Sequence, residues 1–393
     1  MSHRLINLSQ DLRRLREEGY DVSIESAHLV LRSIPFVNSR REVRDGVLVS
    51  NLRLAGDITA APDTHVVWFI GEHPCNIDGT EIVQLTHENR VHDIAPGLRV
   101  DRSFSCKPDG GYLDYYEKMV RYSQIISAPA AAIDASATPR PAKPVESYAG
   151  ESVFKYLDTS SALSGISAIS SKLTMDRVAI VGLGGSGGYI LDQIAKTPIK
   201  EIHLFDGDKF YSHNAFRAPS AASLEQLRAR PSKVEYFAGL YSNMRYGIVP
   251  HNGYVTSETV QVLKGFGFVF LCLDRGTVKM PIISYLQSEG IPFIDAGIGV
   301  YLRDDLGQLD ALCRVTASTA EKNDHISRRV HLSDEAGPDE YHQNIQIADL
   351  NAFTALMAVI KWKKFCGFYV DRKNEHNSTF TLGSNMLISD ELP

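Results

Sequence analysis

Four glycines and one aspartate mark the stretch of this sequence whose chemistry is easiest to recognise. Gly182, Gly184, Gly185 and Gly187 follow a short apolar run, and Asp206 closes a second run about twenty residues later. Glycines let the backbone approach a phosphate or a ribose, and the N-terminus of the following helix presents free N–H groups. An acid at this distance is placed to hold ribose hydroxyls. The spacing therefore predicts a nucleotide site.

The elements that position these residues read as strand, turn, helix and strand. Residues 177–181 form an apolar run typical of a buried parallel strand. Residues 188–196 carry apolar side chains at helical spacing, and residues 201–205 form a second strand. Such a unit serves nicotinamide, flavin, methyl-donor and ATP sites alike, so the choice between them depends on the residues that follow.

Polar residues suited to phosphate and metal follow the turn in order. Asp208 comes just after the ribose acid, Asn214 and Arg217 lie in HNAFR, and Lys233 lies in RPSKVEYF. Asp274 ends the next apolar strand, in CLDRGTVK, where ligands of α/β sheets bind. Each has a structural alternative, because Asp208 could cap the turn and the two cations could be solvated surface charges.

Taken together, these residues resemble the adenylation domain shared by ThiF, MoeB and HesA proteins and by ubiquitin-activating enzymes. The shared pattern is G-x-G-G-x-G, D-x-D, N-x-x-R, a lysine and a Cys-x-Asp strand end, and the resemblance covers roughly residues 152–393. It implies a Rossmann-like, mostly parallel α/β sheet. It also implies an adenylyltransferase that uses ATP and Mg²⁺ and activates a carboxylate, which attacks the α-phosphate and releases pyrophosphate.

The resemblance also implies a role for each residue. The nucleotide-binding residues are Gly182, Gly184, Gly185, Gly187, Asp206, Asp208 and Asn214. The catalytic residues are Arg217, Lys233 and Asp274, of which Asp274 is also the Mg²⁺ ligand. Cations aimed at phosphate oxygens would do most of the catalysis, and no general base is needed because a carboxylate is ionised at neutral pH.

The sequence departs from the family at its cysteines. The chain has five cysteines and no C-x-x-C pair, so we expect no zinc site. The loop 316–338, where thioester-forming members place a cysteine, contains none. Ser318 and Thr319 are therefore the candidate acyl acceptors, with His325 as the nearest base. The alternative is direct transfer of the adenylate to a separate acceptor.

The N-terminal region reads as a smaller α+β domain, residues 1–127. A helix, three strands and the segment GEHPCNIDGTEIVQL resemble the order and the His-Pro turn of ubiquitin-conjugating enzymes. Cys75 comes too early to be the catalytic cysteine of that family, so we expect a conjugating-enzyme-like domain without its nucleophile. An unrelated α+β domain is the alternative. The Ala/Pro-rich segment 128–149 reads as a linker, and residues 150–393 as the adenylation domain.

The composition argues against several other classes of protein. The chain has 393 residues, 44% of them hydrophobic, and a net charge of −6, so it shows no basic footprint for nucleic acid. No apolar run approaches the ~20 residues that span a bilayer. Scattered cysteines favour a reducing cytoplasm.

We therefore expect adenylation of the C-terminal carboxylate of a ubiquitin-like protein, followed by transfer to a conjugating-enzyme-like partner in a bacterial ubiquitination-like pathway. One alternative keeps the chemistry but activates a carboxylate for sulfur transfer, or a small or tRNA-linked carboxylate. An NAD-dependent oxidoreductase would explain the glycines and Asp206, but not the later residues. A non-catalytic scaffold should have lost some of those residues. A single glycine fingerprint also predicts a homodimer, with Lys155 as a substitute for the arginine that a partner subunit supplies in the family.

Overall fold

A computed structural model describes residues 2–147, 150, 152–164, 166–303, 305–332 and 345–392. The chain divides into two units. The N-terminal unit comprises Met1–Val145 with Asp158–Gly165, and the C-terminal unit comprises Glu146–Leu157 with Ile166–Pro393. Among the helices of the described residues, none has the length and apolarity that a membrane crossing requires.

An eight-stranded sheet forms the centre of the C-terminal unit, in the order β13-β12-β11-β14-β15-β16-β17-β18. Strands β13 to β15 are parallel, and β16 to β18 continue the sheet in antiparallel pairs. Their bounds are β11 Arg177–Val181, β12 Glu201–Asp206, β13 Ile248–Asn252, β14 Phe268–Leu271, β15 Phe293–Arg303, β16 Gln308–Ser318, β17 Asn377–Thr381 and β18 Met386–Asp390. The prediction of a Rossmann-like, mostly parallel α/β sheet is confirmed.

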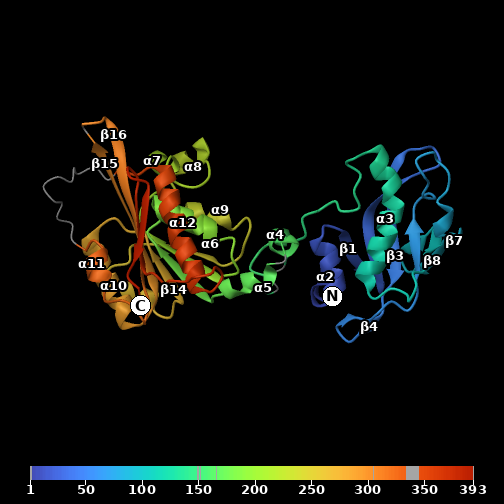
Figure 1. Cartoon of the computed structure of the whole chain (residues 1–393), viewed down its shortest axis with the longest axis horizontal. Coiled ribbons are helices and arrows are strands. Elements are labelled where there is room, and N and C mark those ends of the chain that lie inside the picture. Colours follow the sequence, from blue (N-terminus) through green and yellow to red (C-terminus); the bar gives the residue numbers. More distant parts are fainter. Residues whose placement is uncertain are drawn as a thin grey trace. The chain divides into compact units, whose positions relative to one another are not determined.

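Helices cover both faces of this sheet because its buried strands are apolar on both sides. Along β11, Val178 and Ile180 pack with α6, α9 and α12, whereas Ala179 and Val181 pack with α10 and η3 (Figure 1). The helices are α5 Ser167–Ser170, η2 Ser171–Leu173, α6 Gly185–Ile194, α7 Ser212–Ala215, α8 Leu224–Ala229, α9 Lys233–Tyr241, η3 Val260–Leu263, α10 Gly276–Ser288, α11 Ile326–Arg329 and α12 Ala348–Phe365.

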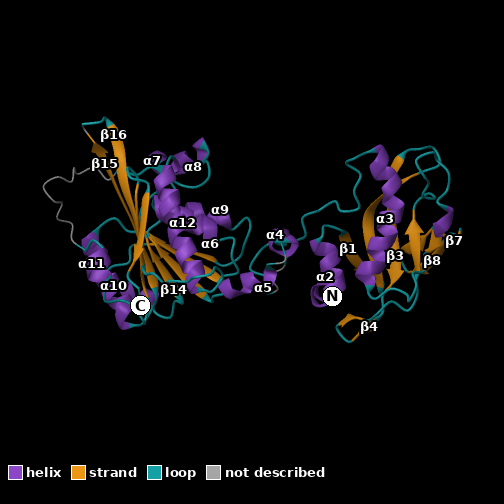
Figure 2. Cartoon of the chain, viewed as in Figure 1, coloured by secondary structure: helices purple, strands orange, loops and turns teal. Residues whose placement is uncertain are grey.

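The N-terminal unit is the predicted smaller α+β domain. Its antiparallel sheet has the order β1-β2-β3-β6-β10-β7, and α2 and α3 bury one face of it (Figure 2). The helices are α1 Ser2–Leu8, α2 Gln10–Glu17, η1 Val83–Leu85, α3 Tyr115–Ile133 and α4 Thr159–Leu163. The strands are β1 Asp21–Glu25, β2 His28–Val37, β3 Val43–Asn51, β4 Leu54–Ala55, β5 Ile58–Thr59, β6 Val66–Ile70, β7 Thr86–Glu88, β8 His92–Ala95, β9 Leu98–Val100 and β10 Arg102–Ser105.

The segment predicted as a linker, 128–149, starts inside α3, whose alanine-rich end continues the helix. Beyond the helix, Arg140 pairs with Glu18 at 3.0 Å and Lys143 pairs with Asp21 at 2.6 Å. These contacts lie within the N-terminal unit. The domain boundaries chosen from the sequence stay a prediction.

A fully buried arginine stabilises the chain at the C-terminal end of α6. The guanidinium of Arg245 donates to the carbonyl oxygens of Ala195 at 3.2 Å, Thr197 at 3.1 Å and Ile199, and its Nε donates to Tyr246 at 2.9 Å. Burial lowers the pKa of Arg245 to about 10. Because α6 begins at the glycine turn, this anchor at its far end fixes the helix whose N-terminus lines the predicted site.

Replacing Arg245 should destabilise the C-terminal unit. Arg245→Met leaves several buried carbonyl oxygens without donors, and each such group costs about 1–3 kcal/mol, so we expect a loss of about 3 kcal/mol or more in urea unfolding. The control is Arg228→Met on the exposed surface of α8, which should change stability by less than about 0.5 kcal/mol. Equal stability of the two variants would contradict the anchoring role.

Candidate active site

Parallel strands bring the predicted residues to one edge of the sheet. Val181 is in register with Phe205 of β12 and Leu271 of β14. The residues that follow these strands, which include the glycine turn, Asp206 and Asp274, therefore leave the sheet at its carboxyl edge. Ligands of open α/β sheets bind at such an edge, where the strand order reverses between β11 and β14.

The glycines of the turn differ in how closely they are packed. Gly182 has φ +93°, and a Cβ there would lie 2.5 Å from the carbonyl oxygen of Cys272. A Cβ on Gly187 would overlap the carbonyl oxygen of Gly182. For a Cβ on Gly184, in contrast, the nearest atom among the described residues is Oε1 of Gln346, at 3.9 Å. The glycines therefore serve two purposes, since Gly182 and Gly187 close the turn and Gly184 leaves space for a ligand.

Asp206 is held rigidly beside this turn. Its Oδ2 accepts the Leu183 N–H at 2.7 Å, and its Oδ1 accepts the Asp208 N–H at 2.8 Å. The residue is only 7% exposed. Each carboxylate oxygen keeps a second lone pair, so the bound carboxylate can still accept a ribose hydroxyl.

Lys233 joins the two aspartates. Its Nζ lies 2.6 Å from Oδ2 of Asp208 and 3.5 Å from Oδ2 of Asp206. The hydroxyl of Tyr254 donates to Oδ1 of Asp208. Partial burial of Asp208 opposes its ionisation, but the bonds from Lys233 and Tyr254, with the charges of Lys233 and Arg217, outweigh burial and lower the pKa of Asp208. Asp208 is therefore a charged member of the site rather than a simple turn cap.

Asn214 lies in the short helix α7, and Arg217 lies in the turn just after it. Asn214 is 4% exposed, and its Oδ1 accepts the Tyr211 N–H at 2.9 Å. The Arg217 N–H donates to the Asn214 carbonyl at 3.1 Å. The buried Nε of Arg217 has no hydrogen-bond partner among the described residues. The charge of Arg217 helps to lower the pKa of Asp208, so Arg217 lies within electrostatic range of this cluster.

Asp274 lies just beyond β14 at the same edge, with its side chain exposed. Within the described ranges, no group of three or more His, Cys, Asp or Glu side chains could hold a metal ion. Mg²⁺ commonly uses one or two carboxylates and completes its shell with phosphate oxygens and water. The exposed carboxylate of Asp274 at the carboxyl edge of the sheet fits that requirement.

Ser318 and Thr319 lie elsewhere. β16 runs antiparallel, so Ser318 pairs with Phe293, the first residue of β15, and is only 3% exposed. The hydroxyl of Thr319 lies 3.1 Å from Nε2 of His376, while Nε2 of His325 lies 2.9 Å from the carbonyl oxygen of Ala317. The structure does not bring these hydroxyls to the glycine turn. The part of the predicted acceptor loop from 333 onwards lies outside the described residues.

The environments of four cysteines favour the neutral thiol over the thiolate. Burial raises the pKa of Cys75, which is 1% exposed and donates to the carbonyl oxygen of His73 at 3.3 Å. Burial also raises the pKa of Cys272 and Cys313, and that of Cys366 to about 11. A thiolate nucleophile needs a lowered pKa, and none of these four sites provides one.

Sequence reasoning missed Asn351 of α12, which lies against the glycine turn. Its Oδ1 accepts from the Ser186 hydroxyl at 3.3 Å, and its Nδ2 is buried without a hydrogen-bond partner among the described residues. A Cβ on Gly185 would overlap this amide. The signal was an asparagine in the apolar stripe of a long helix.

A buried ion triad was also missed. Asp295 of β15 is fully buried between Nζ of Lys279 at 2.8 Å and a guanidinium nitrogen of Arg314 at 2.6 Å. It is in register with Leu271, so it lies next to the carboxyl edge. An aspartate inside the apolar run IPFIDAG was the available signal.

The opposite edge of the sheet carries a hollow of about 350 Å³. It is lined by Thr174, Met175, Asp176, Arg177, Gly265 and Gly267. These residues lie at or before the starts of β11 and β14, so the hollow is separate from the glycine turn.

Comparison with protein families matches residues 162–380 to the ThiF family and residues 10–159 to a domain of unknown function, DUF6791. No curated protein matches the chain. Among solved structures, E. coli MccB with MccA-N7isoASN is 16% identical over 57% of this chain and 66% of that chain, with a TM-score of 0.47. E. coli MccB with ATP gives the same identity and coverage and a TM-score of 0.45. The structure of PaaA is 16% identical over 57% of this chain and 75% of that chain, with a TM-score of 0.43.

Two glycine substitutions test which glycines are needed for packing of the turn and which leave space for a ligand. Gly187→Ala should destabilise the C-terminal unit by about 1–3 kcal/mol in urea unfolding, because its methyl group overlaps backbone that cannot move. Gly184→Ala should keep stability within about 1 kcal/mol of wild type, since among the described residues its methyl group makes only an ordinary contact with Gln346 at 3.9 Å. A larger loss of stability in Gly184→Ala than in Gly187→Ala would contradict this account of the turn.

Proposed function

The chain belongs to the ThiF family, whose match covers more than half of it, and we propose that its C-terminal unit is an ATP-dependent adenylyltransferase. The observation that carries this proposal is the convergence of Asp206, Asp208 and Lys233 beside the glycine turn. An oxidoreductase site needs the ribose acid but no buried lysine between two aspartates. An adenylating site needs that cation, because negative charge builds on phosphate oxygens.

In this proposal each residue has a separate task. Asp206 accepts the ribose hydroxyls, and the open space above Gly184 takes phosphate near the N-terminus of α6. Lys233, Arg217 and Asn214 bind the triphosphate, and Lys233 exchanges Asp208 for a phosphate oxygen when ATP enters. Asp274 would hold Mg²⁺, which supplies positive charge to the departing pyrophosphate. The substrate carboxylate attacks the α-phosphate as an anion, so no proton has to be removed.

The proposed substrate is the C-terminal carboxylate of a ubiquitin-like protein. Support comes from the N-terminal unit, in which a helix precedes an antiparallel sheet and a His-Pro turn closes with the Asn76 N–H bonded to the Thr80 carbonyl at 2.7 Å. That order resembles a conjugating enzyme, but buried Cys75 cannot accept an acyl group. A separate conjugating-enzyme-like protein is therefore the proposed acceptor. Activation for sulfur transfer, or of a small or tRNA-linked carboxylate, would use the same site.

Ser318 and Thr319 are left out of this mechanism. Ser318 is the last residue of the antiparallel strand β16, away from the carboxyl edge, and is buried, and Thr319 follows it. An ester on either hydroxyl would require the adenylate to travel along the sheet. Direct transfer to a separate acceptor needs no such movement.

The family chemistry predicts a homodimer, since the chain carries one glycine fingerprint. Lys155 lies over the ring of Tyr246, 5.4 Å from its centroid, near the start of β13 and away from the carboxyl edge of its own sheet. It could therefore contribute only to the site of the partner subunit.

If the protein is a homodimer, light scattering should give twice the chain mass at micromolar concentration, and Lys155→Ala should lower the rate of adenylation. A fully active monomer would contradict this.

Pyrophosphate exchange tests the proposed reaction. Incubation with ATP, Mg²⁺ and a panel of ubiquitin-like proteins ending in glycine should move labelled pyrophosphate into ATP. Lys233→Met and Asp274→Ala should lower the rate at least 100-fold, because each removes about 3 kcal/mol or more of charge stabilisation from the transition state. Carriers with an amidated C-terminus are the matched control and should give no exchange. Exchange that survives either substitution, or that needs no carboxylate, would reject the assignment.

A further inference from the structure

The residues of the family pattern leave the base of the nucleotide without a binding residue, and a residue for it can be assigned only if the proposed function holds. The glycine turn after β11 takes phosphate, and Asp206 after β12 takes the ribose. The neighbouring strand on the same side is β13. A nucleotide that lies along this edge therefore places its base beyond the end of β13, where Gly253 and Tyr254 follow.

Tyr254 is fixed at that position by its neighbours. The Gly253 N–H donates to the Asp206 carbonyl at 3.2 Å, and Val255 is buried in the core at 3% exposure. The ring of Tyr254 packs over Gly207, where a Cβ would lie 2.7 Å from ring carbons. The glycine between the two aspartates therefore makes room for the ring.

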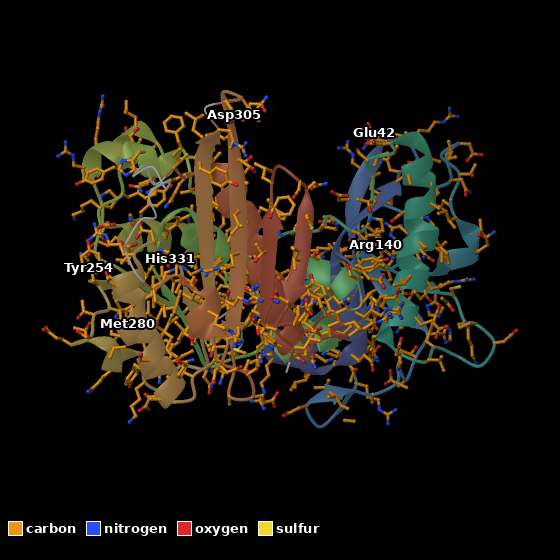
Figure 3. The ribbon with its side chains drawn as sticks, turned by 60° about the vertical axis from the view of Figure 1, so that its left-hand side comes forward. Glu42, Arg140, Tyr254, Met280, Asp305 and His331 are labelled. Carbon is orange, nitrogen blue, oxygen red and sulfur yellow. The ribbon has the colours of Figure 1, made fainter. Side chains whose placement is uncertain are left out.

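The ring is nevertheless open to solvent, because Tyr254 is 62% exposed. Figure 3 labels Tyr254 at the outside of the C-terminal unit. Its hydroxyl donates to Oδ1 of Asp208, whose other oxygen accepts from Lys233 at 2.6 Å. An exposed aromatic ring whose backbone and hydroxyl are both tied to the site is pre-organised for stacking.

We propose that Tyr254 is a nucleotide-positioning residue, whose ring face contacts the adenosine while its hydroxyl holds Asp208 in place for Lys233. Stacking of a base on an aromatic ring is tolerant of base identity, because every base has a π-face. The ring therefore contributes affinity for adenosine, and the residue should not discriminate strongly between purines.

The test compares ATP with inorganic tripolyphosphate, which has the phosphates but no adenosine. Binding of each is measured by calorimetry with Mg²⁺ on the full chain. Tyr254→Leu removes both the ring and the hydroxyl, so it should weaken ATP binding about thirtyfold or more, whereas tripolyphosphate binding should weaken only about threefold, the share of the lost hydrogen bond. Tyr254→Phe keeps the ring and loses only that hydrogen bond, so the binding of ATP and of tripolyphosphate should each weaken about threefold.

Tyr301→Leu is the matched control, since Tyr301 is also an exposed tyrosine, at 44%, in the same unit. It should leave both affinities unchanged. Equal weakening of ATP and tripolyphosphate by Tyr254→Leu would show that the residue acts only through Asp208 and Lys233, and unchanged ATP binding would show no role; either result overturns the proposal. If the wild-type chain binds tripolyphosphate but not ATP, or binds neither, the proposed function fails as well.

Discussion

A buried lysine charge between two carboxylates is the interaction on which the rest of this site depends. Lys233 has a side chain only 8% exposed, and a desolvated ammonium group must be paired. Two elements provide the pairing. β12 delivers Asp206 and Asp208, and α9 begins at Lys233 under a capping box in which Ser232 accepts the Glu235 N–H at 3.2 Å. The aspartates and Lys233 neutralise one another in this structure, and in the proposed mechanism a triphosphate would compete with the aspartates for the lysine charge.

Much of the adenylation domain could be predicted from the sequence because its signals are local. The βαβ unit is contiguous, and its strands end where the apolar runs end, so the edge that gathers Asp206 and Asp274 follows from parallel topology. Membership of the ThiF family, predicted from the ordered residues, is confirmed by the match over residues 162–380. The structure places Asp206, Asp208, Lys233 and Asp274 at one edge of the sheet, while their predicted roles stay proposals.

The remaining features depend on contacts that are distant in sequence. Asn351 reaches Ser186 across 165 residues, and Tyr254 reaches Asp208 across 46. Ser318 and Thr319 follow their strand in sequence, but the antiparallel direction of β16 carries them away from the edge. The N-terminal domain was the weakest prediction, because a short His-Pro motif does not define a fold. Its α+β class is confirmed, whereas the conjugating-enzyme likeness is not, since residues 10–159 match only a domain of unknown function.

The central claim, that nucleotide binds at the carboxyl edge of the β11–β14 sheet, is tested most directly by hydrogen exchange with and without Mg²⁺ and ATP. Bound nucleotide should slow exchange of the backbone amides at 183–188 and 207–217 and leave the amino edge unchanged. Slower exchange around Arg177, Gly265 and Gly267, which line the hollow at the opposite edge, with no change at the glycine turn, would contradict the account.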